Sequence, residues 1–269
     1  MFKEIILAAE GNDNDNAALP FVAGLADQLK LPLAVLSVAS DAQAVDARRK
    51  QLEAMLNQHA LKDAKIEIIE GADPAATLVE ILGRRAGALC CMATHARAPA
   101  GEAVFGSVSA EVVRAGVAPV VLFGPGFSAQ SAPKTENLLV CMDSSPLSEA
   151  ILPTAAAIAK GGGARICLVE MVQSHPGVRA ASEPVLETAN VRRQAEKLAS
   201  EYGINADWEA LHGNTPGDAI ADFARHLPSA MIALTTHGRT GLSRLIAGSV
   251  AQRVIRSADC PVLVLRPDS

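Results

Sequence analysis

The stretch TTHGRTGLSRLIAGSVAQRVIRSADCPVLVLRP, residues 235–267, occurs a second time in the chain in a diverged form. The other copy is ATHARAPAGEAVFGSVSAEVVRAGVAPVVLFGP at residues 93–125, at a constant offset of 142 residues without a gap. Eleven of the 33 aligned positions are identical, among them the Gly-Ser-Val triplets at 106–108 and 248–250. Self-similarity at a fixed spacing is the mark of a duplicated structural unit. The sequence therefore predicts two copies of one fold.

The repeat extends upstream of these segments. The same offset matches Gly71 to Gly213 and Pro74 to Pro216, whereas near the start of each copy the offset falls to 133 and pairs Glu10 with Asp143. The difference of nine residues fits a longer loop in the second copy, around 173–184. A chain of 269 residues has room for two domains of ordinary size. We predict domains at 1–127 and 136–269, joined by a linker at 130–136 that is rich in Ser, Pro and Lys.

Each copy alternates short apolar runs with helix-compatible stretches. We expect strands at 4–9, 33–38, 65–69, 88–92 and 119–123, and again at 137–142, 165–171, 206–211, 230–234 and 261–265. Helices are expected to begin near 17, 43, 74 and 106, and near 146, 187, 216 and 249. This alternation is typical of a mostly parallel sheet covered by helices on both faces. The predicted fold class is α/β, with two tandem doubly wound domains.

Composition narrows the classes of function. The formal charge of −5, with one Trp and one Tyr, argues against nucleic-acid binding, which needs clustered Lys and Arg or stacking aromatics. No apolar stretch approaches membrane-spanning length. The five cysteines lack zinc-ligand spacing, so we predict no metal site and a cytoplasmic protein. Residues 12–16 alternate Asn and Asp and are predicted to form a solvated turn, and the glycines at 161–163 a helix stop.

In a doubly wound sheet, ligands bind beyond the carboxyl ends of the strands, where the strand order reverses. Two parts of the second copy belong there: Asp143 after its first strand, and 235–239 after its fourth, leading to Gly248-Ser249 at the start of a helix. Free N–H groups and the helix dipole at that start attract a phosphate, which a glycine lets the main chain approach. Gly238 would allow a similar backbone contact, and the Asp143 carboxylate would accept hydrogen bonds from a base or ribose.

Each of these residues also has a purely structural interpretation. A Gly-Ser pair before a helix is often only an N-cap, and Asp143 can satisfy the turn that precedes the next helix. His95 and His237 recur at matching positions, as structural histidines do. Neither has an identifiable partner acid or nucleophile, so we predict no catalytic residue.

The segment 235–267 resembles the C-terminal signature of the universal stress protein family, and LLVCMDSSPLSEA at 138–150 resembles the first strand and Asp-containing turn of that family. The resemblance covers nearly the whole chain, twice. It implies a five-stranded parallel domain of the adenine nucleotide alpha hydrolase-like kind, and assembly through the last strand. For tandem members it implies that the two copies pair as an intrachain pseudo-dimer. A homodimer of chains is a further option.

Family members that bind ATP carry glycine, two residues, glycine, nine residues, then glycine and Ser or Thr. In the second copy Gly238, Gly248 and Ser249 fit this spacing, while Thr235 stands in place of the first glycine. The resemblance also implies that the end of the second strand lines the adenine pocket, and core packing is the alternative for that residue. The nucleotide-site residues predicted on this basis are Asp143, Met171, Thr235, His237, Gly238, Arg239, Gly248, Ser249 and Val250.

The first copy departs further from the pattern. Ala93 and Ala96 replace both leading glycines, and Glu10 stands where the second copy has Asp143. We therefore predict a cytoplasmic universal stress protein that binds or senses ATP, with Mg²⁺ as an option, through its second domain. At most slow ATP hydrolysis is expected, so the chain is not predicted to be an enzyme. The alternative is a stress-response interaction module in which both sites are vestigial.

Overall fold

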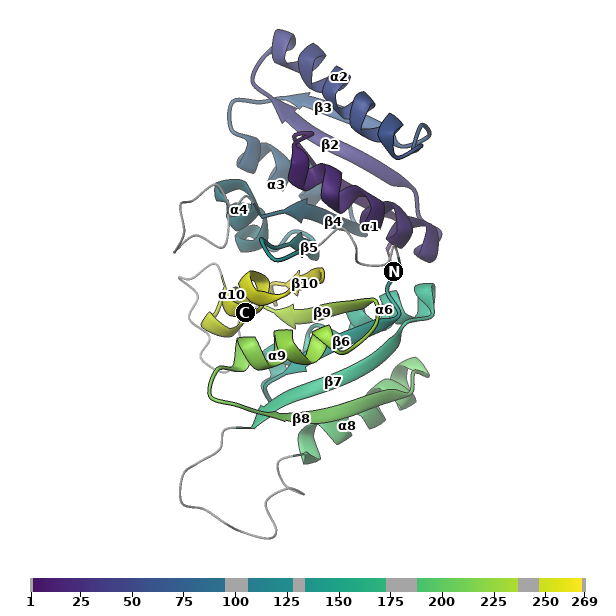
Figure 1. Ribbon diagram of the computed structural model, residues 1–269, viewed down its shortest axis with the longest axis vertical. Helices are drawn as coiled ribbons and strands as arrows, with labels where there is room; N and C mark the ends of the chain where they lie inside the picture. The colour runs from purple at the N-terminus through teal and green to yellow at the C-terminus, as the bar shows by residue number, and fades with distance from the viewer. Residues whose placement is uncertain (1, 95–105, 128–133, 173–187, 237–246, 268–269) are drawn as a thin grey trace.

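Five strands form in each copy, each within one residue of its predicted bounds. The structure, a computed structural model, describes residues 2–94, 106–127, 134–172, 188–236 and 247–267 (Figure 1). The strands of the first copy are β1 (Glu4–Ala8), β2 (Leu33–Ala39), β3 (Lys65–Glu70), β4 (Ala88–Ala93) and β5 (Val120–Phe123). Those of the second are β6 (Asn137–Met142), β7 (Arg165–Val172), β8 (Ala206–His212), β9 (Ala230–Thr235) and β10 (Val262–Leu265).

All ten strands belong to one sheet, in the order β3-β2-β1-β4-β5-β10-β9-β6-β7-β8. Neighbours within each copy are parallel, and only β5 and β10, where the copies meet, pair antiparallel. The predicted fold class is therefore confirmed. The pairing through the last strands is the intrachain pseudo-dimer that the resemblance implied.

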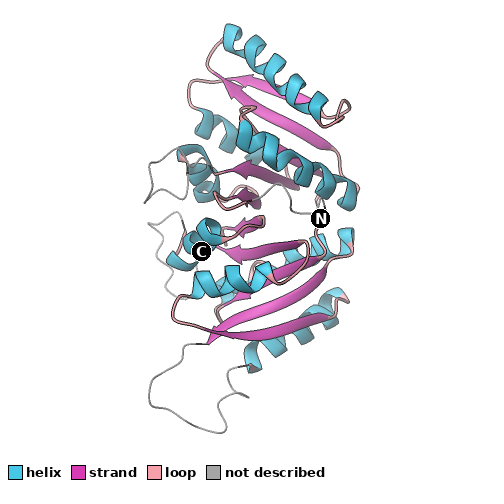
Figure 2. Ribbon diagram, in the orientation of Figure 1, coloured by secondary structure: helices cyan, strands magenta, loops and turns pink. Residues whose placement is uncertain are grey.

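The helices cover both faces of this sheet (Figure 2). One face carries α1 (Asp13–Leu29), α2 (Ala42–Gln58), α6 (Leu152–Gly162) and α8 (Ala189–Lys197), which continues into a π-helical turn at Leu198–Tyr202. The other face carries α3 (Pro74–Arg84), α4 (Ser107–Ala115), α9 (Pro216–Arg225) and α10 (Ser249–Ser257). The short helix α5 (Pro146–Glu149) precedes α6.

Among the described helices, α1, α2, α3 and α5 begin with a side-chain N-cap. Asp73 before Pro74 and Ser145 before Pro146 accept backbone hydrogen bonds as N-caps. Thr215 holds the N-cap position of α9 but makes no side-chain cap.

The first helix differs from the prediction. Its N-cap is Asn12, which forms a capping box with Asp15, so α1 begins at Asp13 rather than near Ala17. The run at 12–16 is the first turn of a helix and not a solvated turn, because its acidic residues suit the positive end of the helix dipole.

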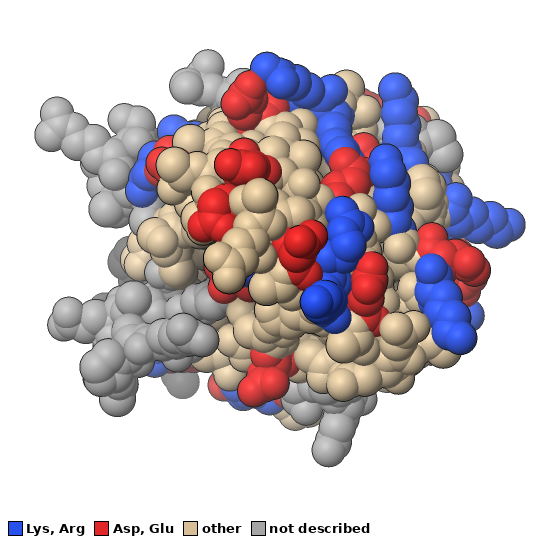
Figure 3. Space-filling view, turned by 90° about the horizontal axis from the view of Figure 1, so that it is seen from above, with Lys and Arg blue, Asp and Glu red and all other residues tan. Residues whose placement is uncertain are grey.

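On the surface seen in Figure 3, basic and acidic side chains are interspersed. Within the described ranges, none of the helices is both long and apolar enough to cross a bilayer.

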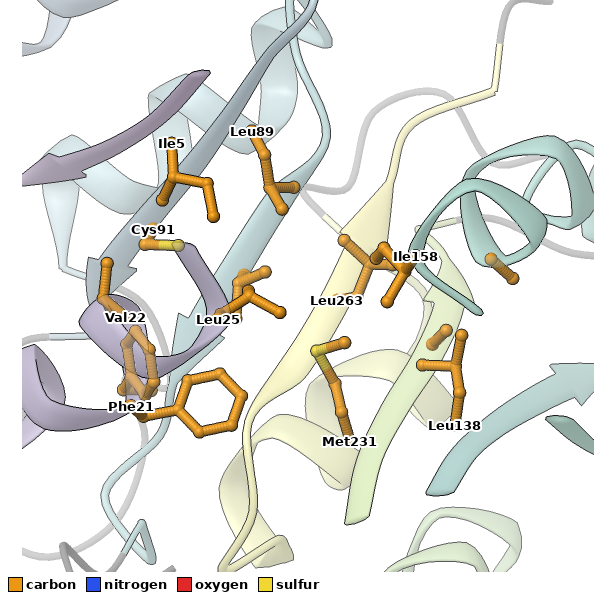
Figure 4. Close-up of a cluster of buried hydrophobic side chains, with 14 of the residues drawn as sticks. Ile5, Phe21, Val22, Leu25, Leu89, Cys91, Leu138, Ile158, Met231 and Leu263 are labelled. Atoms are coloured by element: carbon orange, nitrogen blue, oxygen red, sulfur yellow. The ribbon is translucent and has the colours of Figure 1, made fainter. Parts of the chain in front are cut away.

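Two buried clusters fill the space between sheet and helices, and each contains residues of both copies. In Figure 4, Leu25 and Leu89 of the first copy belong to the same cluster as Met231 and Leu263 of the second. The core is therefore continuous across the boundary between the copies.

The junction between the copies is centred on the β5–β10 pair. Val121 lies opposite Leu263, with Leu122 opposite Val262 and Val120 opposite Val264, a register that is symmetric under the 142-residue repeat. Just beyond β5, a Cβ placed on Gly124 would lie 2.1 Å from the Ile255 carbonyl oxygen, a distance that no side chain tolerates.

A second contact lies on the face of α1 and α6. A Cβ on Gly161 would lie 2.9 Å from the Leu29 side chain, and one on Gly162 would lie 2.8 Å from the Gln28 side chain. The Gln28 amide nitrogen donates to Thr135 O (2.7 Å) and Gly162 O (2.9 Å), and its oxygen accepts from Thr135 N (2.9 Å). The predicted helix stop is confirmed, since Gly163 is the left-handed C-cap of α6. Of the predicted linker, 130–133 lie outside the described residues, and Thr135 is buried in this contact.

We predict that Gly124→Ala destabilises the protein. The added methyl group has to displace the backbone at Ile255, and overpacking of this kind lowers the free energy of unfolding by about 1–3 kcal/mol. Urea denaturation measures the change. Gly83→Ala is the control, because Gly83 lies inside α3 with its nearest neighbour, Val117 Cγ1, at 3.6 Å from the new Cβ. That variant should be as stable as the parent or more so, and equal stability of Gly124→Ala would contradict the prediction.

Candidate functional site

The predicted residues that the structure describes collect at one edge of the second copy. Asp143 follows β6, Thr235 ends β9, and Met171 is the penultimate residue of β7. Strand β6 lies between β9 and β7, which is where the strand order of this half reverses. Gly248 and Ser249 reach the same edge, because the Gly248 N–H donates to Thr236 O at 2.7 Å. His237, Gly238 and Arg239 lie outside the described residues.

The turn after β6 is built around the Asp143 carboxylate. Its Oδ1 accepts from the N–H of Ser145 at 3.1 Å and from the Ser145 hydroxyl at 2.5 Å. The Asp143 N–H donates to Ser148 Oγ at 3.3 Å. The structural interpretation of Asp143, as the residue that satisfies this turn, is thus correct for Oδ1.

Glu170 in β7 is a polar residue of this edge that the sequence analysis missed. It is 5% exposed and accepts hydrogen bonds from the Ser144 hydroxyl and from Asn190 Nδ2, the latter at 3.3 Å. Ser144 has a φ of +63°, a left-handed conformation that its bond to Glu170 helps to hold. A single acidic residue within the apolar run of β7 was the available signal. Met171, next in sequence, packs partly buried against the cluster on the opposite face.

The start of α10 is not capped by a side chain. Gly248 is the N-cap residue and Ser249 the first helical residue, so within the Gly-Ser pair it is Gly248 that holds the N-cap position. Ser249 is exposed, and Val250 is 39% exposed. A Cβ on Gly248 would lie 3.4 Å from Thr236 O, an ordinary contact. Packing within the described residues therefore does not require a glycine at this position.

The corresponding turn of the first copy is filled by the chain itself. Oδ2 of Asp15 accepts from the N–H groups of Glu10 at 2.8 Å, Gly11 at 2.9 Å and Asn12 at 3.2 Å. Three consecutive N–H donors around one oxygen form an anion nest, here occupied by a buried side chain. The repeat offset of 133 places Ser148 at the position of Asp15. The second copy therefore lacks this internal anion.

A small hollow lies nearby in the first copy, at the ends of β4 and β5. It measures about 140 Å³ and is lined by residues that include Asn14, Ala93, Phe123 and Phe127. Sites for drug-sized ligands measure roughly 300–1,000 Å³. The hollow is therefore smaller than such sites.

The cysteines offer no nucleophile at this edge. Burial raises the pKa of Cys90 to about 12 and that of Cys260 to about 12. Burial also raises the pKa of Cys141, two residues before Asp143, and that of Cys91. Burial raises the pKa of Cys167 to about 11, and the negative charges of Asp207 and Glu209 contribute to this rise. In the described residues, no group of His, Cys, Asp and Glu has the geometry of a metal site.

We predict that all five thiols of the native protein react slowly with Ellman's reagent at pH 8. The thiolate is the reactive form, and raised pKa values keep it rare until the pH approaches about 11. Unfolding in guanidinium should release all five thiols for rapid reaction. A thiol in the native protein that reacts at the rate of free cysteine would contradict the prediction.

Comparison with known proteins identifies the family. The profile of the universal stress protein family matches residues 1–124 and again residues 134–266. The chain belongs to the universal stress protein family. Its arrangement, two family domains in tandem, is the one that the resemblance predicted.

Individual members of the universal stress protein family resemble this one over different lengths. Universal stress protein MJ0531 of Methanocaldococcus jannaschii is 31% identical over 140 residues, which cover 49% of this chain and 82% of that protein. Universal stress protein Rv2005c of Mycobacterium tuberculosis H37Rv is 27% identical over 201 residues, which cover 72% of this chain and 66% of that protein. The crystal structure of a universal stress protein from Archaeoglobus fulgidus DSM 4304 matches with a TM-score of 0.73 at 22% identity, over 97% of this chain and 98% of that one. This last likeness concerns the fold.

Proposed function

We propose that this universal stress protein acts in the stress response by binding an adenine nucleotide, ATP, through its second domain. The observation that carries the proposal is the contrast between the two copies at the same edge of the sheet. In the second, the uncapped start of α10 lies beside the Asp143 turn, whereas in the first the Asp15 carboxylate occupies the equivalent turn. We take the domains to be 1–127 and 136–269.

The phosphates are assigned to the start of α10. Because the Gly248 N–H is engaged by Thr236 O, the groups that remain for an anion are the N–H groups of Ser249, Val250 and Ala251. These point out of the helix at its positive end, where phosphate binding is favoured. The exposed Ser249 hydroxyl adds a donor, and Gly248 leaves space for close approach of the ligand.

The base and ribose are assigned to the ends of β6 and β7. There the carboxylate of Asp143 accepts hydrogen bonds, and the half-buried Met171 offers an apolar contact. His237, Gly238 and Arg239 complete the proposed site on the strength of the family spacing alone. Thr235 stands at the position where that pattern has its first glycine.

The proposed role is binding rather than catalysis. Oδ1 of Asp143 is engaged in its own turn, and the thiols have raised pKa values. We propose at most slow ATP hydrolysis, with Mg²⁺ accompanying the phosphates. The cytoplasm is the proposed compartment, in agreement with five free cysteines. No nucleic-acid or membrane partner is proposed, since the surface in Figure 3 mixes both charges. The domains pair within the chain, and a homodimer of chains is a further option.

We predict that calorimetric titration with ATP and Mg²⁺ shows saturable binding near one equivalent. Gly248→Val should abolish it, because a branched side chain would stand where the phosphates approach, although a Cβ itself fits the fold. Gly106→Val is the matched control, since Gly106 is the N-cap of α4 in the first copy. This variant should bind ATP like the parent.

Absence of heat with a folded parent protein would overturn the proposal. The alternative, an interaction module with both sites vestigial, would then be preferred. Equal loss of binding in the Gly106 and Gly248 variants would instead overturn the assignment to the second domain. Circular dichroism verifies that each variant is folded.

A further inference from the structure

Helices α9 and α10 are joined by a side-chain network centred on Asp218. Arg253 in α10 donates to both of its carboxylate oxygens, from Nε to Oδ1 at 2.6 Å and from the terminal nitrogen to Oδ2 at 2.8 Å. The Ser257 hydroxyl donates to Oδ1 at 2.9 Å. Arg225 in α9 donates to the Ser257 carbonyl oxygen at 3.0 Å. The two helices are therefore linked over the second half of α10.

The network lies beside a close approach of the two helices. A Cβ on Gly217, beside Asp218, would lie 2.5 Å from Arg253 Cβ and 3.1 Å from the Val250 carbonyl oxygen. Val250 is the second residue of α10 and Gly217 the second residue of α9. The start of α9 thus lies directly against the first turn of α10, and any shift of α9 changes the position of that turn.

The first copy has none of this network. At the offset of 142 residues, the positions of Gly217, Asp218, Arg253, Ser257 and Arg225 hold Ala75, Ala76, Glu111, Ala115 and Gly83. Glu111 pairs within its own helix, with Arg114. The network is thus confined to the second copy, where it joins the helix that begins at the Gly248-Ser249 pair.

We propose that Asp218 and Arg253 are positioning residues, which fix the first turn of α10 so that its N–H groups point at the phosphates of a bound nucleotide. This inference rests on the proposed function and names the device that orients its phosphate end. The Arg253 guanidinium is turned toward α9 and engaged by Asp218, so it acts through the helix and not on the ligand. Exposed ion pairs contribute little to global stability. The Asp218–Arg253 ion pair instead contributes through preorganisation, because N–H groups that are already in place bind a phosphate with a smaller loss of entropy.

The experiment compares ATP with adenosine on the full chain. Asp218→Ala should weaken ATP binding about three- to tenfold, in the range of couplings that act through packed elements. Adenosine, measured by competition with a fluorescent ATP analogue, should bind unchanged because it has no phosphate. Arg253→Lys, which keeps the charge but loses the two-pronged contact, should lie in between. Glu111→Ala is the control, because Glu111 occupies the place of Arg253 in the first copy.

The outcomes separate the two proposals. Absence of ATP binding by the parent protein overturns the proposed function. Normal ATP affinity in Asp218→Ala, with a parent that binds, overturns the positioning role and leaves the function standing. Equal weakening of ATP binding and adenosine binding also overturns the positioning role, because a general disturbance of the domain has that effect. Selective weakening of ATP, with Glu111→Ala like the parent, supports the proposal.

Discussion

The close contact between Gly124 and the Ile255 carbonyl oxygen determines how the two halves of the molecule meet. It lies just beyond the antiparallel β5–β10 pair, and it allows the C-terminal end of α10 to lie against the first domain. The repeat places Arg266 at the position of Gly124, and Arg266 lies against Gly116. At each of these contacts the first copy supplies a glycine, and the second copy supplies the group that packs against it.

The same complementarity occurs on the opposite face. Gly161 and Gly162 of α6 make room for Leu29 and Gln28 of α1, and the offset of 133 matches Gln28 to Gly161 itself. If two first domains paired with each other, large side chains would collide at this place. If two second domains paired, glycines would face each other and leave a gap. The halves of the duplicated chain have therefore become shape-specific partners of each other, even though the strand register between them has kept its symmetry.

The sequence predicted the strands and the fold class better than the contacts within the candidate site. Apolar runs and the repeat located every strand that the structure describes, because buried parallel strands are read directly as apolar segments. One helix was expected from Pro146, but the structure divides it into α5 and α6, since Pro153 has no N–H to bond to the Glu149 carbonyl oxygen. The sequence also predicted that Asp143, Thr235 and Gly248 come together. It did not predict the roles of Asp15 and Glu170, because these depend on which N–H and hydroxyl groups the folded turns bring near them.

The continuous core makes the two domains one thermodynamic unit. Both buried clusters draw residues from both halves, so neither half can unfold without exposing apolar surface of the other. The free energy that any ligand contributes to the native state is consequently shared by the entire chain. The first domain, whose own turn is closed by Asp15, would therefore share the thermal stability that a ligand of the second domain contributes.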